Sequence, residues 1–173
     1  SLFYNPLTYL LLAVDGPDPE FPRRATSFGG IYQFYDREVP DTLVTTVDYP
    51  SNHTFVLIST VANDVGVPEI IRGHEGSIYF EEKGLVLRFQ EKISSRKKEL
   101  RLPCERPGTI REHLSNFLQS VRTRKEPNCP PYLAYRAQVA IHMAVVSYRE
   151  GNTTYWHRRK EQIYLCGEAL KKS

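Results

Sequence analysis

The chain has 173 residues and a net charge of +3, from 23 Lys and Arg against 20 Asp and Glu. With 40% hydrophobic and 25% charged residues it can bury a core without disulfides, which excludes a collagen-like or disordered chain. Its longest apolar run, Leu10 to Val14, is far shorter than the roughly 20 residues of a membrane-spanning helix, so we expect a soluble protein and no membrane partner. No basic face is evident, and we expect no nucleic-acid partner.

The cysteines and histidines give no sign of a metal site. Cys104, Cys129 and Cys166 are an odd number without CxxC spacing, which argues against a disulfide scaffold and a zinc centre. No two of the five histidines have the HxxxH spacing of a zinc site. We therefore expect free thiols, no metal and a cytoplasmic location.

The first predicted element is a short helix. Asn5 is expected to be its N-cap, because Pro6 then occupies the first helical position. Apolar residues recur at helical spacing as far as Val14, and residues 15–17 end the helix with Asp, Gly and Pro. The proline-rich residues 16–24 predict an irregular connection.

A strand pattern follows. Residues 42–49 alternate, but neither face is wholly apolar, so one side of the sheet is expected to face water or a partner. Short turns such as Lys83-Gly84 join consecutive strands and favour an antiparallel meander. The expected strands are residues 28–35, 42–49, 54–61, 69–72, 77–81, 85–90 and 100–102.

The last third is predicted to be helical. Thr109 and Glu112 form a capping box at the start of one helix. A second helix covers about 132–149 and ends at Gly151, whereas the residues after Trp156 give no clear pattern. The predicted fold class is α+β, with an open, mostly antiparallel multi-stranded sheet and helices packed on one face.

Few residue patterns point to chemistry. The ten glycines never form GxGxxG or GxxxxGK[ST], so we expect no nucleotide cofactor to bind this chain. The charged residues 36–41 either line a substrate cleft or form a solvated turn, and the turn is favoured because loop charges are common. His142, beside an apolar stripe, is expected to be partly buried. No Ser/His/Asp or Cys/His arrangement is identifiable, and the catalytic residues stay unknown.

Several segments occur in a distinctive order along the chain. They are GGIY at 29–32, DREVPDT at 36–42, IRGHEGSIYF at 71–80, HLSNFLQSVRTRKEP at 113–127, SYREG at 147–151, and Trp156. Together they resemble the C-terminal domain of the Gfo/Idh/MocA oxidoreductases over most of the chain. The resemblance implies a two-domain enzyme whose N-terminal Rossmann domain, which binds NAD or NADP, is absent here. The start at Ser1, inside an apolar segment and without Met, is expected for such a fragment.

The same resemblance suggests which residues contact a substrate. In the family the catalytic lysine belongs to the Rossmann domain, and an Asp-x-x-x-His motif opens the second domain. Here that motif falls on Asn5 to Tyr9, so neither its acid nor its histidine is present. Asn5, Tyr9, Asp36 and Arg37 are the candidate substrate-binding residues. The structural alternatives are that Asn5 caps the helix and Tyr9 covers apolar surface.

Two functions are consistent with these observations. In the first, residues 1–173 are a single C-terminal substrate and oligomerisation domain of an NAD(P)-dependent oxidoreductase that acts on a sugar or polyol derivative. The fragment alone is then inactive, and the open sheet face forms a homo-oligomer. In the second, the chain is a non-catalytic binding or assembly module that keeps the fold but has lost the catalytic pair.

Overall fold

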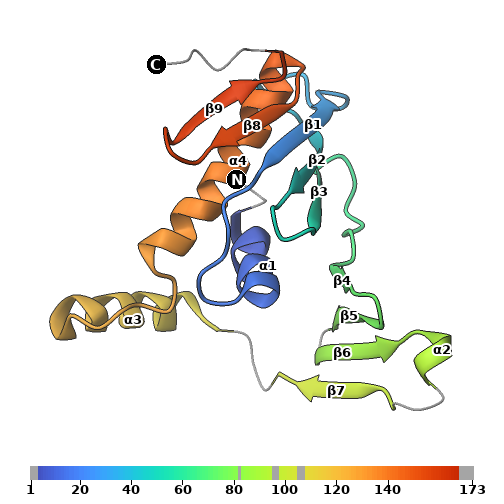
Figure 1. Ribbon diagram of the computed structural model, residues 1–173, viewed down its shortest axis with the longest axis vertical. Coiled ribbons are helices and arrows are strands. Elements are labelled where there is room, and N and C mark those ends of the chain that lie inside the picture. The colour runs from blue at the N-terminus through green and yellow to red at the C-terminus, as the bar shows by residue number, and fades with distance from the viewer. Residues whose placement is uncertain (1–3, 82, 95–97, 105–107, 168–173) are drawn as a thin grey trace. The chain divides into compact units, whose positions relative to one another are not determined.

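The computed structural model describes residues 4–81, 83–94, 98–104 and 108–167 (Figure 1). The chain forms two compact units, one from residues 1–64 with 129–173 and the other from residues 65–128. Each unit has its own antiparallel sheet. None of the helices in the described ranges has the length and apolar character needed to cross a membrane.

The first unit contains a five-stranded sheet with the strand order β3-β2-β1-β8-β9. All its neighbouring strands are antiparallel. Near the end of the chain β8 pairs with β1 and β9 pairs with β8, so the sheet joins segments more than a hundred residues apart in sequence. Its strands are β1 (Arg24–Gly30), β2 (Thr42–Asp48), β3 (Thr54–Thr60), β8 (Thr154–His157) and β9 (Gln162–Leu165).

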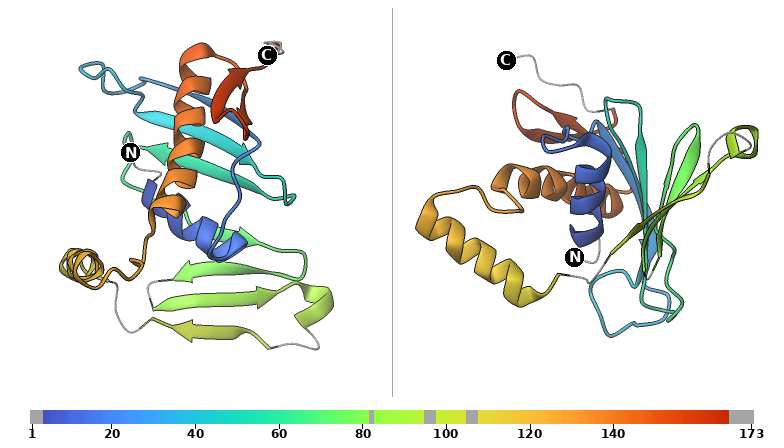
Figure 2. Two further views of the ribbon diagram at one scale, coloured as in Figure 1. Left: turned by 60° about the vertical axis from the view of Figure 1, so that its left-hand side comes forward. Right: turned by 90° about the horizontal axis from the view of Figure 1, so that it is seen from below.

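Helices α1 (Tyr4–Asp15) and α4 (Pro131–Glu150) cover the same face of this sheet (Figure 2). Leu7 and Leu11 of α1 are fully buried, as the helical spacing of its leucines predicts. On α4 the small residues Ala137 and Ala140 are buried in the same core, where they allow the helix to approach the strands closely. Within the first unit, none of the described helices covers the opposite face of the sheet.

Buried hydroxyl groups join α4 to the sheet. The Ser147 hydroxyl accepts a hydrogen bond of 2.9 Å from the amide of Ser27, whose own hydroxyl lies 2.7 Å from that of Thr45. The Thr154 hydroxyl lies 3.1 Å from the carbonyl oxygens of both Ala25 and Met143, and its single O–H can donate to either. These polar groups therefore enter the core with partners, which avoids the cost of burying them unpaired.

The second unit contains a four-stranded sheet, β4-β5-β6-β7. Across it Arg88 of β6 pairs with Glu81 of β5 at 2.8 Å and with Glu99, the residue before β7, at 3.1 Å. Thr109 and Glu112 form the predicted capping box of α3. The elements of this unit are β4 (Ile70–Arg72), β5 (Gly76–Glu81), β6 (Gly84–Phe89), α2 (Glu91–Ser94), β7 (Leu100–Pro103) and α3 (Ile110–Thr123).

The α+β class and the open antiparallel sheet are confirmed, with the strands divided between two sheets. The strand predicted at 28–35 is wrong in its second half: β1 ends at Gly30, and residues 31–41 form a loop. The N-cap prediction for Asn5 is also wrong, since α1 begins one residue earlier at Tyr4. Helix α4 ends at Gly151 with a φ of 60°, as predicted.

Candidate functional site

The four candidate substrate residues lie in two separate places. Tyr9 lies on α1 and is about one-third exposed. Asn5 is in the first turn of the same helix, and its side chain lies outside the described part of the chain. Asp36 and Arg37 belong to the loop 31–41 between β1 and β2. This loop lies near the C-terminal end of α4, whereas α1 packs beside its N-terminal half (Figures 1 and 2).

Asp36 and Arg37 are solvated, as the turn interpretation predicts. The Asp36 side chain is 80% exposed, and the Arg37 Nε lies 4.0 Å from its carboxylate. The Arg37 guanidinium also lies over the ring of Phe34, 4.7 Å from the ring centre. Both charges are therefore held on the surface of the loop and do not line a cleft with Tyr9.

Asp41 is the buried member of the same charged segment. Its Oδ2 accepts hydrogen bonds from the amides of Gln33 at 2.7 Å, Tyr32 at 2.8 Å and Phe34 at 3.1 Å. The Gln33 amide is the main cause that lowers the pKa of Asp41 below its ordinary value. One carboxylate thus holds the loop that carries Asp36 and Arg37.

A second polar cluster joins α1 to the β2–β3 turn. His53 Nε2 lies 3.6 Å from Asp15 Oδ1, and His53 Nδ1 lies 3.2 Å from the Ser51 hydroxyl. The imidazole stacks on Tyr49 at 4.7 Å. Burial raises the pKa of Tyr49, and the charge of Asp15 raises it further. Although Ser, His and Asp meet here, the Asp15 and His53 side chains are only 7% and 19% exposed, so the cluster binds α1 to the turn and offers a substrate little access.

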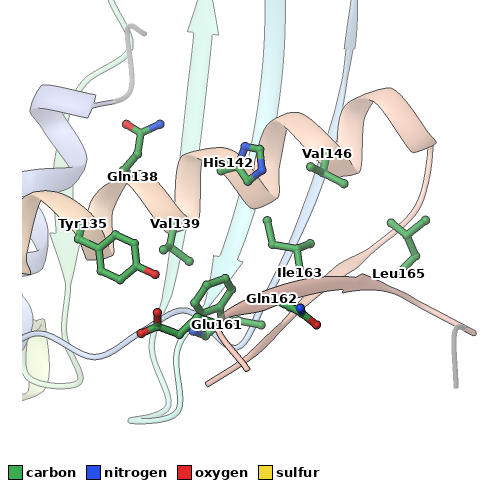
Figure 3. Close-up of a pocket in the computed structure, with 10 residues that line it drawn as sticks. Tyr135, Gln138, Val139, His142, Val146, Glu161, Gln162, Ile163 and Leu165 are labelled. Atoms are coloured by element: carbon green, nitrogen blue, oxygen red, sulfur yellow. The ribbon is translucent and has the colours of Figure 1, made fainter. Parts of the chain in front are cut away.

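A cleft with polar and apolar side chains lies in the first unit, between α4 and the β8–β9 hairpin (Figure 3). Its volume is about 650 Å³, within the range of ligand pockets. It combines apolar side chains from both elements with five polar ones. The lining residues are Tyr135, Gln138, Val139, His142, Val146, Trp156, Glu161, Gln162, Ile163 and Leu165.

Aromatic rings form one end of this cleft. Phe21 stacks on Trp156 at 5.8 Å and meets Tyr135 edge-on at 5.7 Å. Partial burial raises the pKa of Tyr135, and the charge of the nearby Glu161 carboxylate raises it further. The indole Nε1 of Trp156 is buried and has no hydrogen-bond acceptor among the described residues.

Sequence reasoning missed this cleft. It predicted a partly buried His142, but His142 is exposed and borders the cleft. The helical spacing of Tyr135, Gln138 and His142 could have predicted the polar wall that α4 contributes to the cleft. The opposite wall could not be found, because the β8–β9 hairpin was not predicted.

The lining of this cleft does not suit a nucleotide, and the described residues form no metal-ligand cluster. No three His, Cys, Asp or Glu residues within the described ranges gather as metal ligands. The cleft is lined by neither Lys nor Arg, and no glycine-rich loop borders it. A pyrophosphate would therefore meet the Glu161 carboxylate without a compensating cation.

No family model matches the chain, and the search of curated proteins found no match. Solved structures do share its fold. A UDP-N-acetylglucosamine 3-dehydrogenase from Acidithiobacillus ferrooxidans is 12% identical, with a TM-score of 0.67 over 86% of this chain and 46% of that one. An aldose-aldose oxidoreductase from Caulobacter crescentus is 19% identical, with a TM-score of 0.62 over 86% of this chain and 45% of that one. An NAD-binding protein from Listeria innocua is 15% identical, with a TM-score of 0.62 over 88% of this chain and 49% of that one.

These likenesses establish the fold. The chain spans about half the length of each structure that it matches, while nearly nine-tenths of this chain is covered. The fold therefore corresponds to part of a larger architecture in these proteins.

Proposed function

We propose that this chain is the C-terminal substrate-binding and oligomerisation domain of an NAD(P)-dependent oxidoreductase that acts on a sugar or polyol derivative. The observation that carries the proposal is the shared fold, which extends over most of this chain and about half of proteins named as sugar oxidoreductases or NAD-binding proteins. The motifs at 29–42 and 71–80 are consistent with the same family.

The nicotinamide would be held by a Rossmann domain outside this sequence, because the chain has no GxGxxG loop. A bound nicotinamide supplies the hydride chemistry. What this chain supplies is substrate contact. Tyr9 presents a phenol that can donate a hydrogen bond to a substrate oxygen, and Asn5 lies one helical turn before it.

Asp36 and Arg37 are a second pair of proposed substrate-binding residues. Helix α4 has 20 residues and is therefore about 30 Å long, and the loop 31–41 lies at the other end of it from α1. A monosaccharide is much shorter than α4. One small substrate would contact Asn5 and Tyr9, or Asp36 and Arg37, but not both pairs of one chain.

The open face of the β1–β3 sheet supports the oligomer proposal. Phe28, Val44 and Ile58 lie side by side on neighbouring strands and point away from the core, with Val56 beside them. Phe28 is 71% exposed and Val56 is 59% exposed. A second copy of the chain would remove this apolar surface from water.

The alternative, a non-catalytic assembly module, is favoured by one observation. The Asp and His of the family motif are replaced by Asn5 and Tyr9, and no other acid-base group replaces them on α1 within residues 4–14. An asparagine cannot transfer a proton at neutral pH, and an ordinary tyrosine is a weak acid.

Expressing the coding sequence with whatever precedes residue 1 tests the proposal. We expect a preceding half with GxGxxG and an EKP-like lysine, micromolar NAD(P) binding by calorimetry, and sugar-dependent nicotinamide absorbance changes. The 173-residue chain alone should show no NAD(P) binding. Tyr9→Phe should reduce turnover of the longer protein more than Tyr32→Phe, a matched change in the distant loop. A preceding half without a nucleotide fold would contradict the oxidoreductase proposal and favour the assembly module.

A further inference from the structure

We propose that the cleft between α4 and the β8–β9 hairpin binds a neutral, hydroxyl-rich ring compound, such as an uncharged monosaccharide or an inositol. This inference does not rest on the proposed oxidoreductase function, because none of Asn5, Tyr9, Asp36 and Arg37 lines the cleft. It rests on the side chains that surround the cleft and on their charge.

The surfaces of the cleft match the two kinds of surface on a sugar ring. Val139, Ile163 and the indole of Trp156 offer apolar contact to the C–H faces of such a ring. His142 and Gln162 each offer both donors and acceptors for hydroxyl groups. At about 650 Å³, the cleft has room for a monosaccharide together with bridging water.

The charge of the lining residues disfavours anionic ligands. Neither Lys nor Arg is among the lining residues, so a phosphorylated or carboxylated ligand would be bound without a counter-charge. A neutral ligand meets no such penalty, and its hydroxyl groups can donate to Glu161, the one charged side chain among the lining residues.

Two polar groups in the cleft are placed for hydroxyl recognition. The buried Nε1–H of Trp156 has no acceptor among the described residues, so a ligand hydroxyl would supply one. Glu161, with a φ of 49°, occupies a left-handed backbone position that favours glycine. A glutamate at this costly position directs a carboxylate to the Tyr135 hydroxyl at the cleft wall, where it can also accept from a ligand.

The test uses Trp156, the single tryptophan of the chain, as a fluorescent reporter inside the cleft. The 173-residue chain is titrated with D-glucose, N-acetyl-D-glucosamine and myo-inositol, with free tryptophan amide as the blank. We expect a saturable change in emission with at least one of these neutral probes, confirmed by saturation-transfer NMR. Glucose 6-phosphate should bind more weakly than glucose, because no cation lines the cleft.

Glu161→Gln removes the charged acceptor and should weaken the binding about tenfold, since hydrogen bonds to charged groups are the stronger ones. Glu150→Gln at the end of α4 is the matched control and should leave the affinity unchanged. Circular dichroism establishes that both variants are folded, and Val146→Phe, which fills the cleft, should abolish the signal. The proposal is overturned if no neutral probe gives a saturable change, if glucose 6-phosphate binds as tightly as glucose, or if Glu161→Gln matches Glu150→Gln.

Discussion

Asp41 shows how one side chain can shape a whole loop. Most carboxylates in this region are solvated, but Asp41 is buried and accepts three backbone hydrogen bonds. The three amides belong to loop residues that follow β1, which ends at Gly30, and therefore have no partner in the sheet. The loop carrying Asp36 and Arg37 is therefore held by a residue that does not itself face the solvent.

Replacing Asp41 tests this role. Asp41→Asn keeps the size of the side chain but removes its charge, and we expect the melting temperature to fall by several degrees. Asp36→Asn, the matched change at an exposed position of the same loop, should have almost no effect. Thermal unfolding followed by circular dichroism measures both, and equal effects would show that the buried hydrogen bonds contribute nothing particular.

The difference in stability between wild type and Asp41→Asn should depend on pH, because the pKa of Asp41 is lowered in the folded protein. Above the unfolded value of 3.8 the carboxylate is ionised in both states, and its stabilisation is fully present. As the pH falls from 3.8 through the folded pKa, the unfolded chain takes up the proton first and the stabilisation is lost. Urea unfolding should therefore show a stability gap between wild type and Asp41→Asn that is constant near neutrality and narrows below pH 3.8.

At the scale of elements, α1 is attached to the first unit by its apolar stripe. Leu7 and Leu11 are fully buried against the core, while the Asp15–His53 pair holds the C-terminal end of the helix. A short isolated helix is marginal in water, so most of its stability comes from this packing. The placement of Tyr9 therefore depends on residues on the other side of the helix.

Leu11→Ala should lower the free energy of unfolding by about 2–5 kcal/mol, because it leaves a cavity in a packed core. Leu12→Ala is the neighbouring control: Leu12 is 44% exposed, and its truncation should cost less than about 1 kcal/mol. Chemical denaturation of the two variants measures the difference. Similar losses would contradict the packing of α1 through its Leu7–Leu11 stripe.

At the scale of the whole molecule, the first unit has a covered and an open sheet face. Alternate residues of β1, β2 and β3 enter the core, and the exposed residues between them include the apolar patch of Phe28, Val44, Val56 and Ile58. Apolar surface of this kind on neighbouring strands is typical of an interaction site. Self-association through it remains our proposal.

Val56→Glu places a charge in this patch and should shift the chain from dimer or larger to monomer in light scattering. The charge would otherwise be buried unpaired at the interface. Val67→Glu, at a 49% exposed position in the second unit, should leave the molar mass unchanged. A wild-type chain that is monomeric at about 100 μM, where even weak specific interfaces are substantially occupied, would contradict the proposal.

The periodicity and capping signals of the sequence were sufficient for most of the fold. The leucines of α1, the capping box at Thr109, the turn before Gly84 and the cap at Gly151 all act between residues a few positions apart. Local chemistry dictates such features directly, so they can be read without tertiary structure. The candidate residues from the family resemblance were located by the same local order.

What the sequence by itself determined about this protein is its α+β class and most of its element order as far as the end of α4. The tertiary structure alone decided that β8 pairs with β1, that Asp15 meets His53, and that Tyr135 meets Glu161 across a cleft. The physical reason is distance along the chain. A short-range pattern specifies how neighbouring side chains are oriented along a helix or strand. It does not specify which distant segments pack together, because that choice depends on how much apolar surface is buried and how many polar groups find partners in the whole fold.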